Sequence, residues 1–331
     1  MSYKYFFILI FFSFVPTNTD AQKPISFLIG SCAGYEVDWN DKPTDAKFKI
    51  WETMLHTPTD FAIWMGDAVY YRNNDWTNID LMRARNRLYR RDLPYLQQFL
   101  DSRTQYAVWD DHDFGDDNSH GDSPNKAAAM TVFKEFWNNP SYGTDSCKGV
   151  FFSFKRENCE FFMLDVRYQS NLAAGVMLGD CQMRWLQTAL KNSTATFKFI
   201  VGGSQFLPEN RLTESYRKFP KEQKAFLDFL ETAHIKGAIL CSGDVHQTDL
   251  SRKARKTAPP IYEFTCSPFT SFCFPIALPN KYRLRGTSIR KRNFGNISTF
   301  YDATKGWAVR INVQSTLGKL YWSKVLWASD L

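Results

Sequence analysis

The sequence predicts a mixed α/β fold in which helices cover a pair of stacked sheets. Three observations support this prediction: five apolar runs end in polar clusters, amphipathic segments lie between several of them, and strand-like alternation fills the C-terminal section. Aromatic residues make up 16% of the chain, which suits thick layers packed on one another. The sequence has no Gly/Ser-rich or Pro-rich linker and no repeat, so we expect one domain over residues 22–331.

The sequence of residues 1–21 is typical of a secretory signal peptide. Lys4 supplies a positive start, an apolar stretch follows at 5–15, and the sequence ending at Ala21 resembles a small-x-small cleavage site. The apolar stretch is shorter than the roughly 20 residues that span a bilayer, and no later stretch is long or apolar enough. We therefore expect no transmembrane anchor and a soluble, monomeric protein that is secreted or periplasmic.

Strands and helices are expected to follow one another along the chain. Short apolar runs bounded by turn residues predict buried strands at 25–29, 61–65, 105–109, 161–164, 197–201 and 238–241. Apolar residues at helical spacing predict helices at 44–56, 78–100 with a break near Pro94, 126–137, 180–191 and 220–234. A hairpin is expected at 149–154 with 159–164, and antiparallel strands are expected at 307–313 and 319–329.

Polar clusters follow five of the predicted strands at their carboxyl ends. They are GSC at 30–32, GDAVY at 66–70, WDDHD at 109–113, LDVR at 164–167 and SGDVH at 242–246. A parallel or mixed sheet presents such strand ends at one edge, so these side chains are expected to meet in a single crevice. One cluster would be an ordinary turn, but five together predict a multinuclear metal site.

The donor types in these clusters suit metal ions. Asp67 and Tyr70 offer hard oxygens, and one carboxylate can bridge two metals. Asp244 and His246 are two apart on an extended segment, so both can reach one metal cluster. As a thiolate, Cys32 would bind iron or zinc rather than calcium. Taken singly, these residues could be a turn aspartate, a core histidine or half of a disulfide, and only their clustering favours metal ligands.

The cluster at 110–113 carries more carboxylate than a loop near a core tolerates without cations, although a solvated acidic turn is the alternative. Here Asp111 and His112 are candidate catalytic residues, with His112 as an acid, a ligand or a donor to phosphate. Arg167 is expected to clamp phosphate through its planar guanidinium, or else to form a structural pair with Asp165. Two or more metals can activate a water and bind phosphoryl oxygens, so hydrolysis of a phosphate ester fits this set.

The net charge of +7 is concentrated in basic segments at 83–91 and 281–292. These segments are interpreted as solvated faces, or as attraction for an anionic substrate or a phosphate-bearing polymer. Neither segment has the aromatic interleaving of a nucleic-acid module, so a nucleic-acid partner is not expected.

Seven cysteines in an exported chain predict disulfides, and the odd number leaves at least one thiol unpaired. Cys32 belongs to the predicted site. Plausible local bridges join Cys147 with Cys159 and Cys266 with Cys273, although the sequence does not determine the connectivity.

The motifs GSC, GDAVYY, WDDHDFG, FFMLDVR, MLGDCQMRWL and SGDVH occur in this order. From about residue 25 to the C-terminus, the chain resembles the PhoD-like alkaline phosphatase/phosphodiesterase family of the calcineurin-like metallophosphoesterase superfamily. The resemblance implies a four-layer αββα sandwich with a site for Fe³⁺ and Ca²⁺, or another divalent metal. It implies that Cys32, Asp67 and Tyr70 hold the ferric ion, that Asp67 bridges to calcium, and that Asp244 and His246 complete the cluster.

One departure from the family pattern concerns the calcium ligand. The family usually has Asn followed by Asp after WDDHDFG, whereas this chain has Asp117 followed by Asn118. Either Asp117 replaces the amide oxygen, or the loop shifts to present Asn118. The implied function is an exported metal-dependent phosphoesterase acting on phosphate mono- or diesters through a metal-activated water. Alternatives are a phospholipase D-like phosphodiesterase acting on lipid or cell-wall phosphodiesters, and a non-catalytic relative that kept the fold.

Overall fold

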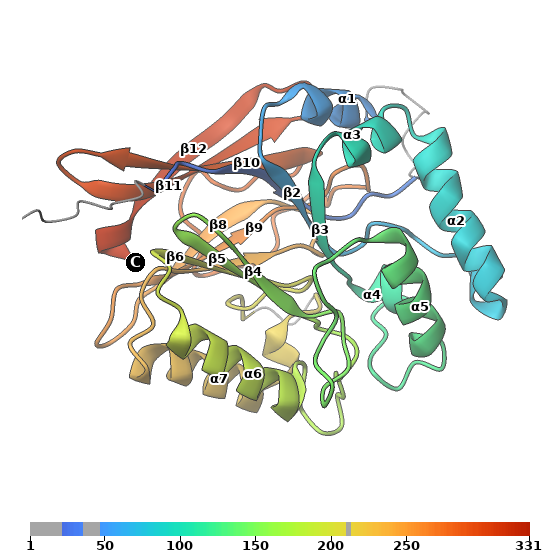
Figure 1. The fold of residues 1–331 in the computed structure, drawn as a ribbon, viewed down its shortest axis with the longest axis horizontal. Helices are drawn as coiled ribbons and strands as arrows, with labels where there is room; N and C mark the ends of the chain where they lie inside the picture. The colour runs from blue at the N-terminus through green and yellow to red at the C-terminus, as the bar shows by residue number, and fades with distance from the viewer. Residues whose placement is uncertain (1–21, 36–46, 210–212) are drawn as a thin grey trace, which may run out of the picture.

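The computed structural model describes residues 22–35, 47–209 and 213–331. Two mixed sheets pack face to face, and helices cover both outer faces (Figure 1). This is the four-layer αββα arrangement that the family resemblance implies. The predicted signal peptide at 1–21 and the first residues of the helix expected at 44–56 lie outside the described residues.

The first sheet has six strands in the order β12-β11-β10-β1-β2-β3. Its parallel half, which ends in three of the polar clusters, is β1 (Ser26–Gly30), β2 (Phe61–Met65) and β3 (Thr104–Val108). Its antiparallel half is a meander of β10 (Asn293–Asp302), β11 (Gly306–Ser315) and β12 (Leu320–Trp327). β1 joins the halves by pairing parallel with β2 and antiparallel with β10.

The second sheet has six strands in the order β4-β5-β6-β7-β9-β8. Its four central strands run parallel: β5 (Cys159–Met163), β6 (Phe197–Val201), β7 (Ala238–Ser242) and β9 (Ile261–Thr265). The edges are antiparallel, with β4 (Phe152–Arg156) forming the expected hairpin with β5, and β8 (Asp249–Lys253) pairing with β9. The strands β8, β9 and β10 were not predicted from the sequence. The edge strand β8 carries charged residues because only one of its sides pairs with the sheet.

The helices divide between the two outer faces (Figure 1). The first sheet is covered by α1 (Lys49–His56), α2 (Ile79–Asp92), α3 (Leu96–Ser102) and α5 (Lys126–Phe136). The second is covered by α6 (Gly179–Asn192) and α7 (Pro220–Thr232). The break predicted near Pro94 is confirmed, since α2 ends at Asp92 and α3 begins at Leu96. Within the described ranges, no helix combines the length and the apolar character needed to cross a bilayer.

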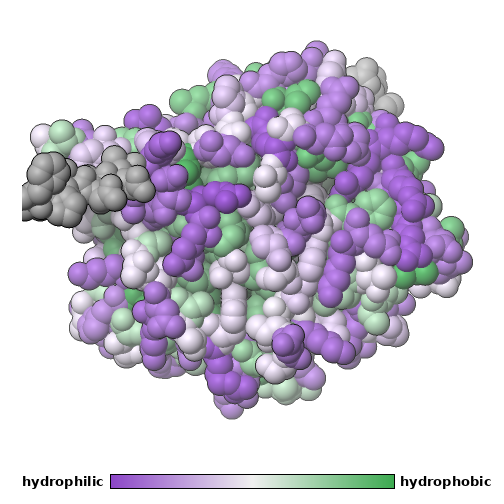
Figure 2. Space-filling view, in the orientation of Figure 1, coloured by the Kyte–Doolittle hydropathy of each residue, from purple (hydrophilic) through white to green (hydrophobic). Residues whose placement is uncertain are grey.

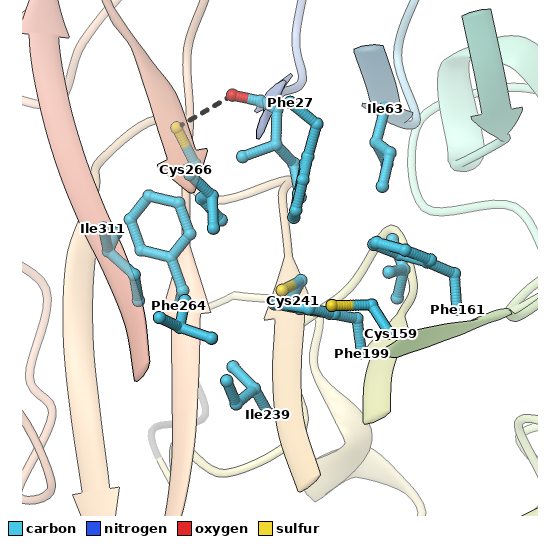
Figure 3. Close-up of a cluster of buried hydrophobic side chains, with 14 of the residues drawn as sticks. Phe27, Ile63, Cys159, Phe161, Phe199, Ile239, Cys241, Phe264, Cys266 and Ile311 are labelled. Atoms are coloured by element: carbon cyan, nitrogen blue, oxygen red, sulfur yellow. Dashed lines mark hydrogen bonds between the residues drawn. The ribbon is translucent and has the colours of Figure 1, made fainter. Parts of the chain in front are cut away.

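The main core lies between the two sheets and is rich in phenylalanine. Phe27 of the first sheet packs edge-on against Phe161 and Phe199 of the second, with ring centroids 5.2 and 5.3 Å apart. Figure 3 shows these rings with Cys159 and Cys241 among them. Such aromatic contacts fix the two sheets against each other, and this brings strand ends of both sheets to one edge. On the face in Figure 2, hydrophobic residues are scattered among hydrophilic ones.

The disulfide pairing differs from the local bridges expected from the sequence. Cys147 is bonded to Cys181 of α6, with the two Cα atoms 5.8 Å apart. The expected partner, Cys159, points from β5 into the core between the sheets and is not disulfide-bonded. The bridge expected between Cys266 and Cys273 is also absent from the described residues, because the buried Cys266 thiol faces the core and lies 3.5 Å from the Ile29 carbonyl oxygen (Figure 3).

Candidate metal centre

The predicted ligands converge where strand ends of both sheets meet. Cys32 and Asp67 follow β1 and β2 of the first sheet, whereas Asp244 and His246 follow β7 of the second. The expectation of a single sheet edge is therefore corrected: the site lies between the edges of two stacked sheets. All four residues have a left-handed backbone, with φ between 49° and 64°. Such conformations are unfavourable for residues with a Cβ and are typical of functional sites.

A first group of donors combines sulfur, nitrogen and oxygen. The ligand atoms of Cys32, Asp67 and His246 all lie within 4.8 Å of one another. The Cys32 Sγ is 3.5 Å from the Asp67 Oδ2. The Tyr70 hydroxyl lies 3.3 Å from the same Asp67 oxygen and 3.4 Å from the His246 Nε2. Burial lowers the pKa of His246 to about 4, so its ring is neutral at pH 7, which is the form that binds metals.

Two further groups are rich in carboxylate oxygens. Asp67 and Asp111 form one with His112, and Asp110 and Asp111 form the other with Asp244. Because Asp67 and Asp111 each belong to two of the three groups, the groups make one continuous cluster rather than separate sites. The buried Asp110 Oδ2 and Asp111 Oδ1 have no hydrogen-bond partner among the described residues.

A one-turn helix, α4 (Asp111–Phe114), places Asp111 and His112 at the cluster. Its capping box is formed by Asp110 and Asp113, and the Asp110 amide donates to the Asp113 Oδ2 at 3.2 Å. Asp113 also accepts from the Val69 amide at 3.0 Å, which ties the turn after β3 to the turn after β2. Asp113 therefore organises the backbone of this turn.

The electrostatics of the cluster favour bound cations. Burial raises the pKa of Asp67 well above its usual value, and the neighbouring carboxylates Asp111 and Asp110 add to the shift. Burial and the same two carboxylates also raise the pKa of Asp244. The pKa of the Cys32 thiol is raised by burial and then by Asp67. Ionising these groups together requires a compensating positive charge, and the donor set fits metal ions.

The cluster opens into a cavity of about 180 Å³. Its lining includes the metal-ligand candidates and an aromatic wall, as follows: Asp67, Asp111, His112, Asp117, Asn118, Thr213, Glu214, Asp244, Val245, His246, Phe272 and Phe274. The His112 ring lies 4.2 Å from the Tyr70 ring, centroid to centroid. The cavity is thus acidic at its base and aromatic on one side.

Asp117 and Asn118 both line this cavity, and Asp117 lies outside the three donor groups. The Asp117 side chain is 74% exposed, and its Oδ1 is 3.6 Å from the His112 Nε2. The Asn118 amide group donates to Asp117 at 2.6 Å, while the Asn118 backbone N–H donates to the Asp111 Oδ2 at 2.7 Å.

Arg167 lies beneath the cluster and does not line the cavity. It is 1% exposed, and its Nε donates to the Asp110 Oδ1 at 2.5 Å. Its Nη1 pairs with Glu214, and its Nη2 is 3.7 Å from the Asp111 Oδ1. Asp165 instead accepts from the Arg167 backbone N–H at 2.9 Å. The guanidinium of Arg167 therefore contacts carboxylates and does not line the cavity in which a substrate phosphate would bind.

Residues 27–306 match the family model for PhoD-like phosphatases. The chain belongs to the PhoD-like phosphatase family. Membership of this family places it among the phosphoester hydrolases. A comparison with curated protein sequences gave no match.

Solved structures share the fold of this PhoD-like phosphatase at low sequence identity. A structure of PhoD superposes with a TM-score of 0.72 at 17% identity, covering 92% of this chain and 68% of that one. The purple acid phosphatase PPD1 from yellow lupin (Lupinus luteus) seeds gives 0.66 at 8% identity, covering 92% and 54%. GAP50, the anchor in the inner membrane complex of Plasmodium, gives 0.56 at 14% identity, covering 92% and 89%. These likenesses establish the fold, which catalysts and an anchor share.

Two functional candidates in this PhoD-like phosphatase were not singled out from the sequence. Glu214 lines the cavity and binds Arg167, and Phe272 packs 4.1 Å from the His246 ring. Glu214 lies in a segment with no motif, 47 residues from Arg167, so no local pattern marks it. For Phe272, the signal in the sequence is the apolar run FCFPIALP at 272–279.

Proposed function

We propose that this PhoD-like phosphatase is an exported, metal-dependent enzyme that hydrolyses phosphate mono- and diesters. The observation that carries the proposal is the set of three overlapping donor groups, joined through Asp67 and Asp111, at the base of an open cavity. Overlapping groups suit two or more ions held close together, which is the arrangement that phosphoester hydrolysis uses. The domain proposed to carry this activity spans residues 22–331, after a signal peptide at 1–21.

We assign the two ends of the cluster to different ions. The thiol of Cys32, the phenol of Tyr70 and the ring of His246 would hold Fe³⁺, because sulfur and nitrogen donors favour transition metals. Asp67 would contribute to both ends. The carboxylates of Asp111 and Asp244 would hold Ca²⁺, which prefers oxygen ligands.

The remaining calcium oxygen would come from Asp117. Its side chain is largely exposed on the cavity rim, so it can turn toward the cluster at little energetic cost. Asn118 would contribute through its backbone, which fixes the Asp111 carboxylate.

Bound ions would draw electron density from the phosphoryl oxygens and supply an activated nucleophile at neutral pH. Within this frame, His112 lines the cavity, and its Nε2 would hold the proton that passes to the departing alkoxide. Asp111 lies at the floor of the cavity, where its carboxylate would help to hold the calcium ion beside the reacting group. Arg167 would act as a positioning residue, since its guanidinium binds Asp110 and lies beside Asp111.

Export and substrate class rest on further features. The Cys147–Cys181 disulfide supports export, because such bonds persist in oxidising compartments. The aromatic wall of Phe272 and Phe274 offers a surface for the organic part of a phosphate ester. This wall suits the second organic group of a phosphodiester, so the activity test should include lipid and cell-wall phosphodiesters as substrates.

The test combines metal analysis with kinetics. Purified protein should contain iron and calcium, and it should hydrolyse p-nitrophenyl phosphate or bis(p-nitrophenyl) phosphate, with the rate falling on chelation and recovering on calcium addition. Asp67→Asn should lower turnover by at least about a thousandfold, since it removes a carboxylate shared by two donor groups. The matched control is Asp116→Asn, because Asp116 is an exposed carboxylate that does not line the cavity.

Full activity in Asp67→Asn would contradict the metal assignment. A protein without metal and without turnover on any ester of the panel would support the non-catalytic alternative.

A further inference from the structure

An unusually apolar loop borders the catalytic cavity. Residues 272–279, with the sequence FCFPIALP, contain no charged or amide side chain. Despite this composition, Ile276 is 71% exposed and Phe272 is 42% exposed, and Pro275 and Ala277 are exposed as well. A run of exposed apolar residues of this length is a liability in water unless it contacts another apolar phase.

The loop is held firmly in this conformation. At its start, the Arg292 Nε donates to the carbonyl oxygens of Thr270 and Ser271 at 2.8 and 3.0 Å. At its end, the Arg283 Nη2 donates to the Leu278 carbonyl oxygen at 2.6 Å. Between these points, the Arg290 guanidinium binds the Pro275 carbonyl. Since guanidinium groups bind the backbone carbonyls, the exposed apolar side chains are presented on a pinned framework.

Exposed positive charge lies beside the loop. Arg290 and Lys291 are exposed, and neither forms an ion pair within the described part of the chain. Arg290 and Lys291 also share the lining of a second cavity, of about 400 Å³, with Phe274 and Pro275 of the loop. The basic and apolar groups are therefore neighbours on one surface.

This surface adjoins the site. Phe274 lines both cavities, and the Phe272 ring packs 4.1 Å from the ring of the proposed ligand His246. An apolar projection flanked by cations is the combination that binds the interface of an anionic membrane: the apolar groups enter the boundary between headgroups and acyl chains, and the cations pair with lipid phosphates.

We propose that the loop at 272–279, with Arg290 and Lys291, docks this protein on an anionic lipid bilayer. The positive charge favours an anionic bilayer over a neutral one, because burial of the apolar side chains alone would stabilise binding to either equally well. Docking places the mouth of the catalytic cavity at the level of the lipid headgroups. The interaction itself does not depend on hydrolysis.

The test measures partition of the full-length mature protein onto vesicles. Sedimentation with vesicles of phosphatidylcholine plus phosphatidylglycerol should show binding that weakens as NaCl rises from 0.1 to 0.5 M. Binding to pure phosphatidylcholine vesicles should be at least about tenfold weaker. Ile276→Asp should lower the partition coefficient at least about tenfold, and Lys291→Glu about fivefold or more.

The matched control is Tyr301→Asp. Tyr301 is 61% exposed, but it lies near the C-terminal end of β10. The loop region adjoins the other end of this strand, at Asn293. This variant should bind as the unsubstituted protein does, and all variants should keep the same thermal unfolding midpoint. Equal binding to neutral and anionic vesicles, no binding to either, or unchanged binding by a folded Ile276→Asp variant would overturn the proposal.

Discussion

Replacing Arg167 by leucine tests the buried network beneath the cluster. The guanidinium is 1% exposed and binds Asp110 and Glu214, which are buried as well. Leucine would leave these carboxylates without their counter-charge. Removing one partner of a buried ion pair costs about 3–5 kcal/mol, so we expect the free energy of unfolding at pH 8 to fall by about this amount.

The loss of stability in Arg167→Leu should depend on pH, and the protonation of Asp110 sets the direction of this dependence. Burial raises the pKa of Asp110 to about 7, although Arg167 opposes the shift. A carboxyl group whose folded pKa exceeds its unfolded value contributes stability at low pH and loses it as pH rises through the folded pKa. Without Arg167 this pKa rises further, so Asp110 stays protonated at pH 5.5 and the variant is penalised less there than at pH 8.

Urea denaturation at pH 5.5 and pH 8 measures both effects. Arg83→Leu is the matched control, since Arg83 pairs with Asp80 and Glu135 on the surface and its loss should change stability little at either pH. A loss below about 1 kcal/mol for Arg167→Leu, or equal losses at the two pH values, would refute the reasoning. The variant should also hydrolyse esters more slowly, because Asp110 and Asp111 lose their orientation.

Three further predictions concern the disulfide, the acid and the ions. Breaking the Cys147–Cys181 bond by a double serine substitution should lower the free energy of unfolding by about 4 kcal/mol, as expected for cysteines 34 residues apart, and dithiothreitol should then have no additional effect in urea titrations. His112→Gln should lower kcat by about 10²–10⁴-fold for alkyl esters and by less for p-nitrophenyl esters, whose leaving group needs no proton; equal losses would exclude the acid role. Chelation should lower the thermal midpoint more at pH 8 than at pH 5, because burial raises the pKa of Asp110 to about 7, so that at pH 5 a proton reduces the negative charge that the cations neutralise; a uniform drop in calorimetry would contradict this.

The cluster shows how far local sequence reasoning extends. Strand ends at Gly30, Met65 and Ser242 could be predicted, because a short apolar run followed by polar turn residues is a local signal. The break between α2 and α3 was equally local, since proline cannot continue a helix. The donor types of Cys32 and Asp67 were likewise readable as metal chemistry.

Other features depended on contacts between distant segments. The guanidinium of Arg167 binds Glu214, which follows it by 47 residues and lies in a segment with no periodic pattern. Cys147 bonds to Cys181 rather than to Cys159, which is closer in the sequence, because the alternation of side chains along β5 points Cys159 into the core. The spacing of residues along the chain does not predict either pairing.

By itself, then, the sequence determined which strands end in donor groups and that those groups suit metal ions, since both follow from short-range patterning and side-chain chemistry. The tertiary structure alone decided that the donors come from the edges of two sheets, that a buried guanidinium supports the carboxylates, and that an apolar loop remains in water beside the cavity. These outcomes depend on how the aromatic core fixes the two sheets against each other, and such packing joins residues far apart in the chain.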